Sequence, residues 1–270
     1  MSADLVRSLF LISRPSPRPS LATVTNALTR WAVRSPGRDA RLGSIALLLG
    51  PSGCGKSTLL RRCCRALGNS VRSGPARTMV AAELTRSRVR VHVPGTPGGI
   101  IIATARTATT LTCQAPVLPA ALQAGRPGDP QSDRLWLGCL VAAGLAEAGL
   151  MLLPVRRLSA GQRARHTLAL AMYLCHLLAE RSRHTAGNGP PPPLLIIDEF
   201  GTGLDAPTAI SLAISLRRWC ATVAVRTVVA TLDVALGAHL EPTITVDLSP
   251  PQDRQTGASG AAVQTRKDAS

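Results

Sequence analysis

Aromatic residues, lysine and paired cysteine motifs are all scarce in this chain of 270 residues. Aromatic side chains make up 2% of the sequence and hydrophobic residues 45%, so aliphatic residues and alanine must fill the core. The composition is that of a globular protein, long enough for one well-filled domain or a domain with a small subdomain. So few aromatics also argue against binding nucleic acid by base stacking.

Lysine occurs only at Lys56 and Lys267, so arginine supplies nearly all of the net charge of +16. A charge of this size suits a nucleic-acid or acidic-membrane surface. The arginines form no block of five or more, which favours the alternative that they are scattered over the surface. The net charge alone therefore does not identify a binding partner.

The seven cysteines include no C-x-x-C pair, and their number is odd. This pattern suggests neither a disulfide framework nor a zinc site. We expect reduced thiols that pack as small apolar residues, as in a cytoplasmic protein.

Long hydrophobic runs are also few. The run at 9–12 is too short for the core of a signal peptide. The longest apolar stretch, Trp136 to Val155, has the length of a membrane span, but Gly and Ala dilute it and Glu147 interrupts it. We therefore expect a helical region there and no membrane span.

The order of the expected elements predicts an α/β fold with a mainly parallel sheet. Buried or alternating runs predict strands at 44–50, 88–93, 99–105, 194–197 and 221–231. Helical patterns lie at 56–67, 117–155, 159–178 and 207–220. The strands at 88–105 predict a β-rich subdomain, and the region at about 117–165 a small helical one.

The strongest motif is GPSGCGKST, which fits the P-loop pattern G-x-x-x-x-G-K-[ST]. It follows an expected strand and opens an expected helix, so its backbone N–H groups and the helix N-terminus can surround a phosphate. Lys56 is expected to reach the β- and γ-phosphates, and the Ser57 hydroxyl to bind Mg²⁺. The residues expected to contact nucleotide are Gly50, Pro51, Ser52, Gly53, Cys54, Gly55, Lys56, Ser57 and Thr58.

A second motif is LLIIDE, an apolar strand that ends in Asp198 and Glu199. The carboxyl end of a strand in an open α/β sheet faces the ligand crevice. Asp198 can hold Mg²⁺ through a water, and Glu199 can act as general base toward the attacking water. Taken alone, the motif is also compatible with a strand that simply meets solvent.

A third motif, LSAGQ, opens the helix at 159–178. Ser159 can serve as its N-cap. A helix N-terminus with a serine hydroxyl and the Gly161 N–H is also an anion site, so the capping and binding interpretations are compatible.

Together these motifs resemble the ATP-binding cassette (ABC) ATPases. GPSGCGKST is similar to the family's Walker A, LSAGQ to its signature sequence, LLIIDEF to its Walker B, and Gly203–Asp205 to its D-loop, over roughly residues 30–247. GLAEA, LSAGQRAR, DEFGTGLDAPTA and VVATLD are most similar to soluble bacterial ABC-type ATPases that are sometimes fused to acetyltransferase domains. The remaining length is too short for such a domain.

The resemblance implies a domain at 30–248 after an N-terminal extension at 1–29. Residues 249–270 lose apolar periodicity, which predicts a disordered tail. In this family two cassettes enclose two ATP molecules. Ser159, Gly161 and Gln162 would then face the γ-phosphate held by the opposite subunit, and Asp205 would lie at the dimer interface. One set of motifs implies a homodimer or a pair with a paralogous cassette.

At three positions this sequence matches the family pattern less closely or departs from it. Gln114 resembles the Q-loop glutamine that contacts Mg²⁺ and the attacking water, although a surface loop glutamine fits as well. Trp31 lies where the family places an adenine-stacking aromatic, although a core tryptophan is equally compatible. Leu232 stands where the family has a histidine that contacts the γ-phosphate, and leucine cannot donate that hydrogen bond.

We therefore expect an ATPase that uses ATP and Mg²⁺, slower than a histidine-bearing relative. Three alternatives stay open: a transporter subunit with membrane domains on other chains, an ATPase acting on nucleic acid, and an ATP-binding switch with little hydrolysis. Intact Glu199 argues against the last alternative.

Overall fold

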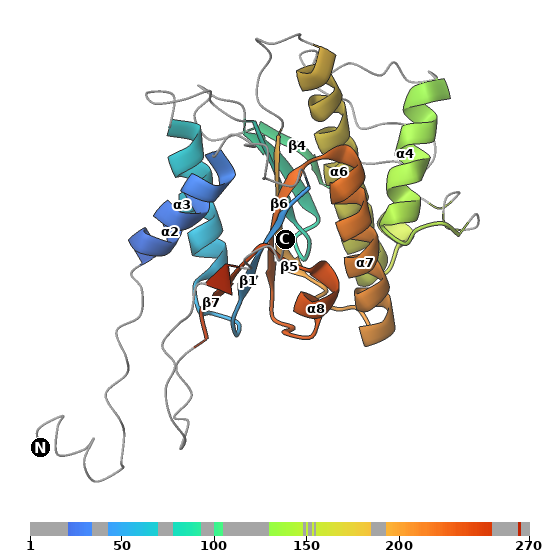
Figure 1. Ribbon diagram of the computed structural model, residues 1–270. Coiled ribbons are helices and arrows are strands. Elements are labelled where there is room, and N and C mark those ends of the chain that lie inside the picture. The colour runs from blue at the N-terminus through green and yellow to red at the C-terminus, as the bar shows by residue number, and fades with distance from the viewer. Residues whose placement is uncertain are drawn as a thin grey trace, which may run out of the picture.

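The chain folds around one sheet with helices on both of its sides (Figure 1). The structure is a computed structural model that describes residues 21–33, 43–69, 78–92, 100–104, 130–147, 150, 153, 155–184, 193–249 and 264–265. Among the described residues, no helix has the length and hydropathy of a membrane span.

The helices are α2 (Leu21–Val33), α3 (Lys56–Asn69), α4 (Pro130–Ala142), the 3₁₀ turn η3 (Val155–Arg157), α6 (Ala160–His184), α7 (Ala206–Val223) and α8 (Leu236–Leu240). The strands are β1 (Ile45–Leu49), β2 (Met79–Glu83), β3 (Arg88–His92), β4 (Ile100–Thr104), β5 (Leu194–Phe200), β6 (Arg226–Thr231), β7 (Ile244–Asp247) and β8 (Gln264–Thr265).

The sheet has eight strands in the order β4-β3-β2-β5-β6-β1-β7-β8. The pairs β2–β5, β5–β6, β6–β1 and β1–β7 are parallel, whereas β3, β4 and β8 pair antiparallel at the two ends. The predicted α/β class with a mainly parallel sheet is confirmed. The expected β-rich part, β2 to β4, continues this sheet, so it shares the central core.

The central strands are buried on both faces, as near-continuous apolar runs in parallel sheets require. All five residues of β1 are buried. Ile45, Leu47 and Leu49 pack on the side of α4, α6 and α7, whereas Ala46 and Leu48 pack on the side of α2 and α3. Alternation along each strand thus gives one core on each side of the sheet.

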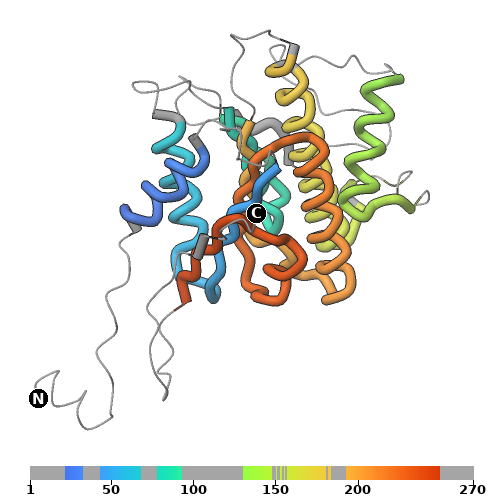
Figure 2. The backbone as a smooth tube through the Cα atoms, viewed as in Figure 1, coloured from blue at the N-terminus to red at the C-terminus, as the bar shows by residue number. Residues whose placement is uncertain are grey.

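Helix α2 was not expected from the sequence and crosses the expected domain boundary at 29/30. Figure 2 shows its backbone lying beside α3, and Val24, Leu28 and Ala32 are at most 3% exposed. These residues recur every four positions and form one helical face. Helix α2 therefore belongs to the layer that covers this side of the sheet.

Two other boundaries differ from those expected. The strand expected at 221–231 begins only at Arg226, because α7 continues to Val223. Ala224 then ends the helix in the left-handed region at φ 61°. The strand expected at 194–197 continues as β5 through Phe200, with an irregular register to β6 after Ile197.

Candidate functional site

The P-loop connects the carboxyl end of β1 to the start of α3, as the motif predicted. Gly50, Gly53 and Gly55 have φ values of 147°, 79° and 101°, a range that favours glycine. A Cβ on Gly50 would lie 2.7 Å from the Cys54 Sγ, so this glycine is also required by close packing. Of the loop residues, Pro51, Ser52, Gly53 and Thr58 are exposed.

Lys56 is buried, with 7% of its surface exposed, and its ammonium group lies across the P-loop. It donates hydrogen bonds to the carbonyl oxygens of Gly50 and Pro51, the latter at 2.8 Å. The Cys54 Sγ is 3.9 Å from the same nitrogen. A buried cation inside a loop of small residues is suited to binding an anion.

Asp198 lies beside this loop, with the Ser57 side chain near its carboxyl. Burial raises the pKa of this carboxyl above the ordinary value, and the nearby Ser57 side chain offsets part of that rise. Its Oδ1 is buried and has no hydrogen-bond partner among the described residues. A buried, unsatisfied carboxylate oxygen next to a serine hydroxyl is suited to a hydrated divalent cation.

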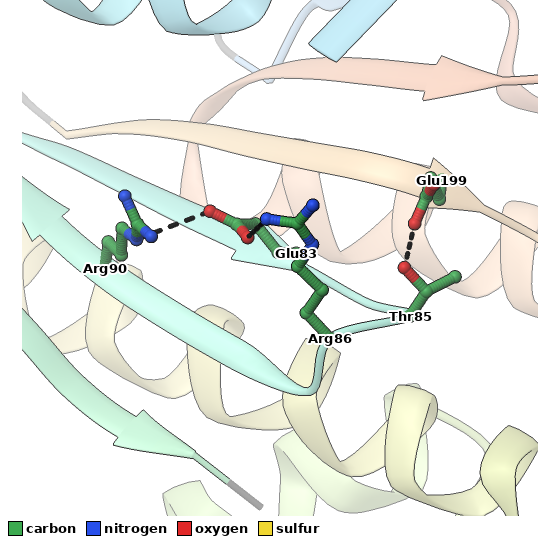
Figure 3. A network of polar contacts seen from close by, with 5 residues as sticks. All are labelled: Glu83, Thr85, Arg86, Arg90 and Glu199. Atoms are coloured by element: carbon green, nitrogen blue, oxygen red, sulfur yellow. Dashed lines mark hydrogen bonds and ion pairs between the residues drawn. The ribbon is translucent and has the colours of Figure 1, made fainter. Parts of the chain in front are cut away.

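Glu199 follows at the irregularity between β5 and β6. Its φ of 62° is in the left-handed region, which is uncommon for a residue other than glycine. The Thr85 hydroxyl, from the turn after β2, donates a hydrogen bond to the Glu199 carboxylate (Figure 3). Asp198 and Glu199 therefore reach the same edge of the sheet as Lys56, with Glu199 on the side of β2.

The LSAGQ motif opens α6 with a reciprocal pair of hydrogen bonds. The Ser159 N–H donates to the Gln162 Oε1 at 2.9 Å, and the Gln162 N–H donates to the Ser159 Oγ at 3.2 Å. This capping box satisfies backbone donors of the first turn. Because the serine oxygen acts here as an acceptor, its hydroxyl hydrogen can still be donated to an anion.

The start of α6 touches the loop that carries Asp205. A Cβ on Gly161 would lie 3.0 Å from the Leu204 Cδ2 and 3.4 Å from the Gly203 carbonyl oxygen. Asp205 is exposed and caps α7, because its carboxylate accepts from the Thr208 N–H at 2.9 Å. The hydrogen bonds from Thr208 lower the pKa of Asp205. Capping of α7 is therefore a role for Asp205 that does not require a dimer interface.

Leu232 follows β6 directly and is 47% exposed at the same edge of the sheet. Val234, two residues further, is 68% exposed. His239 lies on α8 and is partly buried. The loop thus presents apolar side chains where the family pattern has a phosphate-binding histidine.

The structure places Trp31 beside Arg226 and away from the P-loop, and its stacking on adenine stays a prediction. The Arg226 guanidinium lies 5.7 Å from the centre of the Trp31 ring and donates to the Trp31 carbonyl oxygen at 2.6 Å. Arg226 begins β6, whereas the P-loop follows the end of β1, which puts them roughly 15 Å apart along the strands. Gln114 lies outside the described residues.

Thr85 is the site residue that sequence reasoning missed. It sits in a Leu84–Ser87 turn between two strands, and no motif surrounds it. Only the parallel pairing of β2 with β5 brings it to Glu199, since Glu83 is in register with Asp198. Among the described residues, no group of three or more His, Cys, Asp or Glu is placed to hold a metal ion.

No protein-family model matches the chain, and no curated protein matches it. One similar solved structure is CbiO1 from Clostridium perfringens, part of the ABC transporter complex CbiONQ. It is 18% identical to this chain, and the match covers 76% of this chain and 73% of that chain with a TM-score of 0.45. Another is the ATP-binding cassette MJ0796 in a dimeric post-hydrolysis state with ADP and Pi. It is 17% identical, and the match covers 78% of this chain and 84% of that chain with a TM-score of 0.46.

A third is the complex of an archaeal ribosomal stalk protein with an archaeal ribosome recycling factor. The identity is 15%, and the match covers 76% of this chain and 32% of that chain with a TM-score of 0.45. At these identities and TM-scores the likenesses carry no argument of their own. The chain's own sheet order, its P-loop between β1 and α3, and the carboxylates at the end of β5 define a P-loop NTPase fold.

Proposed function

We propose that this protein is an ABC-type ATPase that binds Mg²⁺ and ATP at the Lys56 loop and hydrolyses ATP to ADP and phosphate. The observation that carries the proposal is the contact between Ser57 and Asp198, with Glu199 next in the chain. It brings Walker A and Walker B together at one sheet edge. The LSAGQ helix and the Asp205 loop, which touch each other, support the ABC class in particular.

Lys56 is the group that changes partners when the triphosphate binds. Its ammonium now donates to two carbonyl oxygens of the loop, which are weaker acceptors than phosphate oxygens. We expect these bonds to be replaced by bonds to the β- and γ-phosphates. The N–H groups of Gly53, Gly55 and Lys56, at the start of α3, would surround the same phosphates.

Ser57 and Asp198 would hold Mg²⁺, Ser57 by its hydroxyl and Asp198 through a water. The unsatisfied Asp198 Oδ1 is the observation that favours a cation here. When bound, Mg²⁺ neutralises charge on the β- and γ-phosphates.

Glu199 would orient the attacking water and accept its proton. As the water oxygen bonds to the γ-phosphorus, the bond from that phosphorus to the β–γ bridging oxygen breaks, and ADP leaves with that oxygen. The water proton goes to the Glu199 carboxylate. A positioned general base typically contributes about 10²- to 10⁴-fold to such a step.

A second copy of the chain would complete each site. Helices α3 and α6 both start at the lower edge of the sheet in Figure 1 but lie on opposite sides of it. One chain therefore offers its Lys56 loop and its Ser159 helix at two separate points. In a two-fold pair, the Ser159 hydroxyl of one copy can donate to the γ-phosphate held by the other.

The experiment is ATP turnover by the wild type and by Glu199→Gln. The control is Glu180→Gln, at a partly exposed residue of α6 that pairs with His176. We expect turnover by the wild type and by Glu180→Gln, and a loss of about 100-fold or more in Glu199→Gln with nucleotide binding retained. Equal, near-zero rates in all three proteins would instead favour an ATP-binding switch, the alternative that exposed Leu232 motivates.

The work that the ATPase drives is a separate question. The reduced state of all six described cysteines suits a cytoplasmic location. A transporter subunit should co-purify with a membrane protein of several spans. An ATPase acting on nucleic acid should be stimulated by DNA or RNA with salt-sensitive affinity.

A further inference from the structure

The turn between β2 and β3 delivers Thr85 to the carboxylate of Glu199 (Figure 3). Thr85 is exposed, and its hydroxyl donates to the Glu199 Oε2. Among the described residues it is the only side chain that hydrogen-bonds this carboxylate. A donor from a different strand therefore holds the group proposed as general base.

The turn is fixed in place by backbone and core contacts. The Leu84 N–H donates to the Asp198 carbonyl oxygen at 3.4 Å, and the Leu84 side chain is 4% exposed. The Ser87 N–H donates to the Leu84 carbonyl oxygen at 3.1 Å and closes the turn. Thr85 is thus held at a defined position although its own side chain faces solvent.

Two arginines form ion pairs with the third carboxylate near the site, that of Glu83. Figure 3 shows Glu83 between Arg90 and Arg86, in ion pairs of 3.3 Å and 3.7 Å. Glu83 is the residue in register with Asp198, and its charge contributes to the raised pKa of Asp198. Because Arg86 and Arg90 pair with Glu83, Thr85 is the donor that contacts the Glu199 carboxylate.

The backbone of Glu199 makes such a donor useful. Its φ of 62° and the register irregularity after Ile197 take the residue out of the regular strand. The orientation of its side chain is therefore not set by strand geometry. A side chain that must be held close to its productive geometry needs a partner that fixes its rotamer.

We propose that Thr85 is a positioning residue for ATP hydrolysis, an inference that rests on the proposed function. By binding Oε2, the Thr85 hydroxyl fixes the Glu199 carboxylate and leaves Oε1 to accept the proton of the attacking water. Thr85 touches neither nucleotide nor water in this scheme. Removing the Thr85 hydroxyl should therefore lower kcat and leave KM for ATP nearly unchanged.

The test compares Thr85→Val, which removes the hydroxyl at nearly constant shape, with Thr85→Ser, which keeps it. Thr222→Val is the matched control, because Thr222 is an exposed threonine whose hydroxyl also donates, to the Arg218 carbonyl oxygen on α7. We expect Thr85→Val to lower kcat roughly tenfold, the effect of losing one hydrogen bond to a charged group. KM for ATP should change less than about twofold, and Thr85→Ser and Thr222→Val should keep the wild-type kcat.

A double-mutant cycle gives the readout that a structural role would not produce. If Thr85 acts through Glu199, Thr85→Val should have no further effect on the residual rate of Glu199→Gln. The thermal midpoint of each variant checks that it is folded, and Thr85→Ala is the second variant should the valine protein not fold.

The outcomes separate the two proposals. If wild type exceeds Glu199→Gln while Thr85→Val keeps full kcat, or loses kcat equally in both backgrounds, the positioning role is overturned and the proposed function stands. If wild type is no faster than Glu199→Gln, the proposed hydrolysis fails, and the role of Thr85 fails with it because there is no base to orient.

Discussion

The Ser57 side chain lies beside the Asp198 carboxylate, which brings the first turn of α3 next to the end of β5. The two residues belong to different motifs, and the strand β6 separates their parent strands β1 and β5 in the sheet. Their contact therefore depends on correct parallel pairing of three strands. It is the geometric core of the proposed nucleotide site.

Asp198→Asn should weaken Mg²⁺ binding in the presence of ATP by roughly 10- to 100-fold, the usual effect of losing an outer-shell ligand. Asn keeps the shape but not the charge of the side chain. Mg²⁺ titrations monitored by a fluorescent ATP analogue would measure the change. Asp133→Asn, at an exposed position in the first turn of α4, is the control and should bind as wild type.

The same site should show an unusual pH dependence. Because burial raises the pKa of Asp198, its carboxyl takes up a proton at a higher pH than an ordinary aspartate. Mg²⁺ affinity should therefore begin to fall sooner as the pH is lowered, and Asp198→Asn should lack that decline. An equally steep decline in the Asn variant would assign it to another group.

Leu232→His should accelerate single-turnover hydrolysis by about tenfold, because it adds a phosphate donor at the end of β6. Val234→His places the same side chain two residues along the loop, at a position that is 68% exposed, and should leave the rate unchanged. Quench-flow measurements with excess protein separate the chemical step from product release. An unchanged rate in Leu232→His would mean that the missing histidine explains nothing.

His166 should make the protein sensitive to acid. It lies on α6 at 3% exposure, edge-on to the Trp136 ring, and burial lowers its pKa from 6.5 to about 4. Above pH 6.5 both the folded and unfolded states hold it neutral, so it has no pH effect there. Between 6.5 and about 4 the unfolded state takes up a proton that the folded state does not, and stability falls.

The expected loss at pH 5 is about 2 kcal/mol relative to pH 7, from roughly 1.4 kcal/mol for each pH unit below the unfolded pKa. Urea unfolding at the two pH values would measure it. His166→Phe should remove this loss, whereas His176→Gln, on the partly exposed side of α6, should retain it. A wild type equally stable at both pH values would show that His166 is protonated without penalty.

The sequence was most informative where a motif also dictates backbone geometry. GPSGCGKST predicts a strand, a loop and a helix because its glycines require positive φ and its lysine begins the helix. The LLIID run predicts a buried strand that ends in carboxylates, and the structure places Asp198 against Ser57. Local chemistry sufficed for both.

The remaining features depend on tertiary contacts that no local pattern contains. Thr222 and Val223 favour strand by propensity, yet they end α7 because Val223 is buried in the core. The contact between Trp31 and Arg226 joins residues that lie far apart in the sequence. Thr85 reaches Glu199 only through strand pairing.

The central claim is that one triphosphate is held between the Lys56 loop of one copy and the Ser159 helix of another. The most direct measurement is the mass in solution of Glu199→Gln with Mg²⁺ and ATP, with ADP, and without nucleotide, beside the same protein carrying Lys56→Ala. The account predicts a dimer with ATP alone, and a monomer with ADP, without nucleotide and whenever Lys56 is replaced. A protein that binds ATP yet stays monomeric, or one whose dimerisation ignores nucleotide, would contradict it.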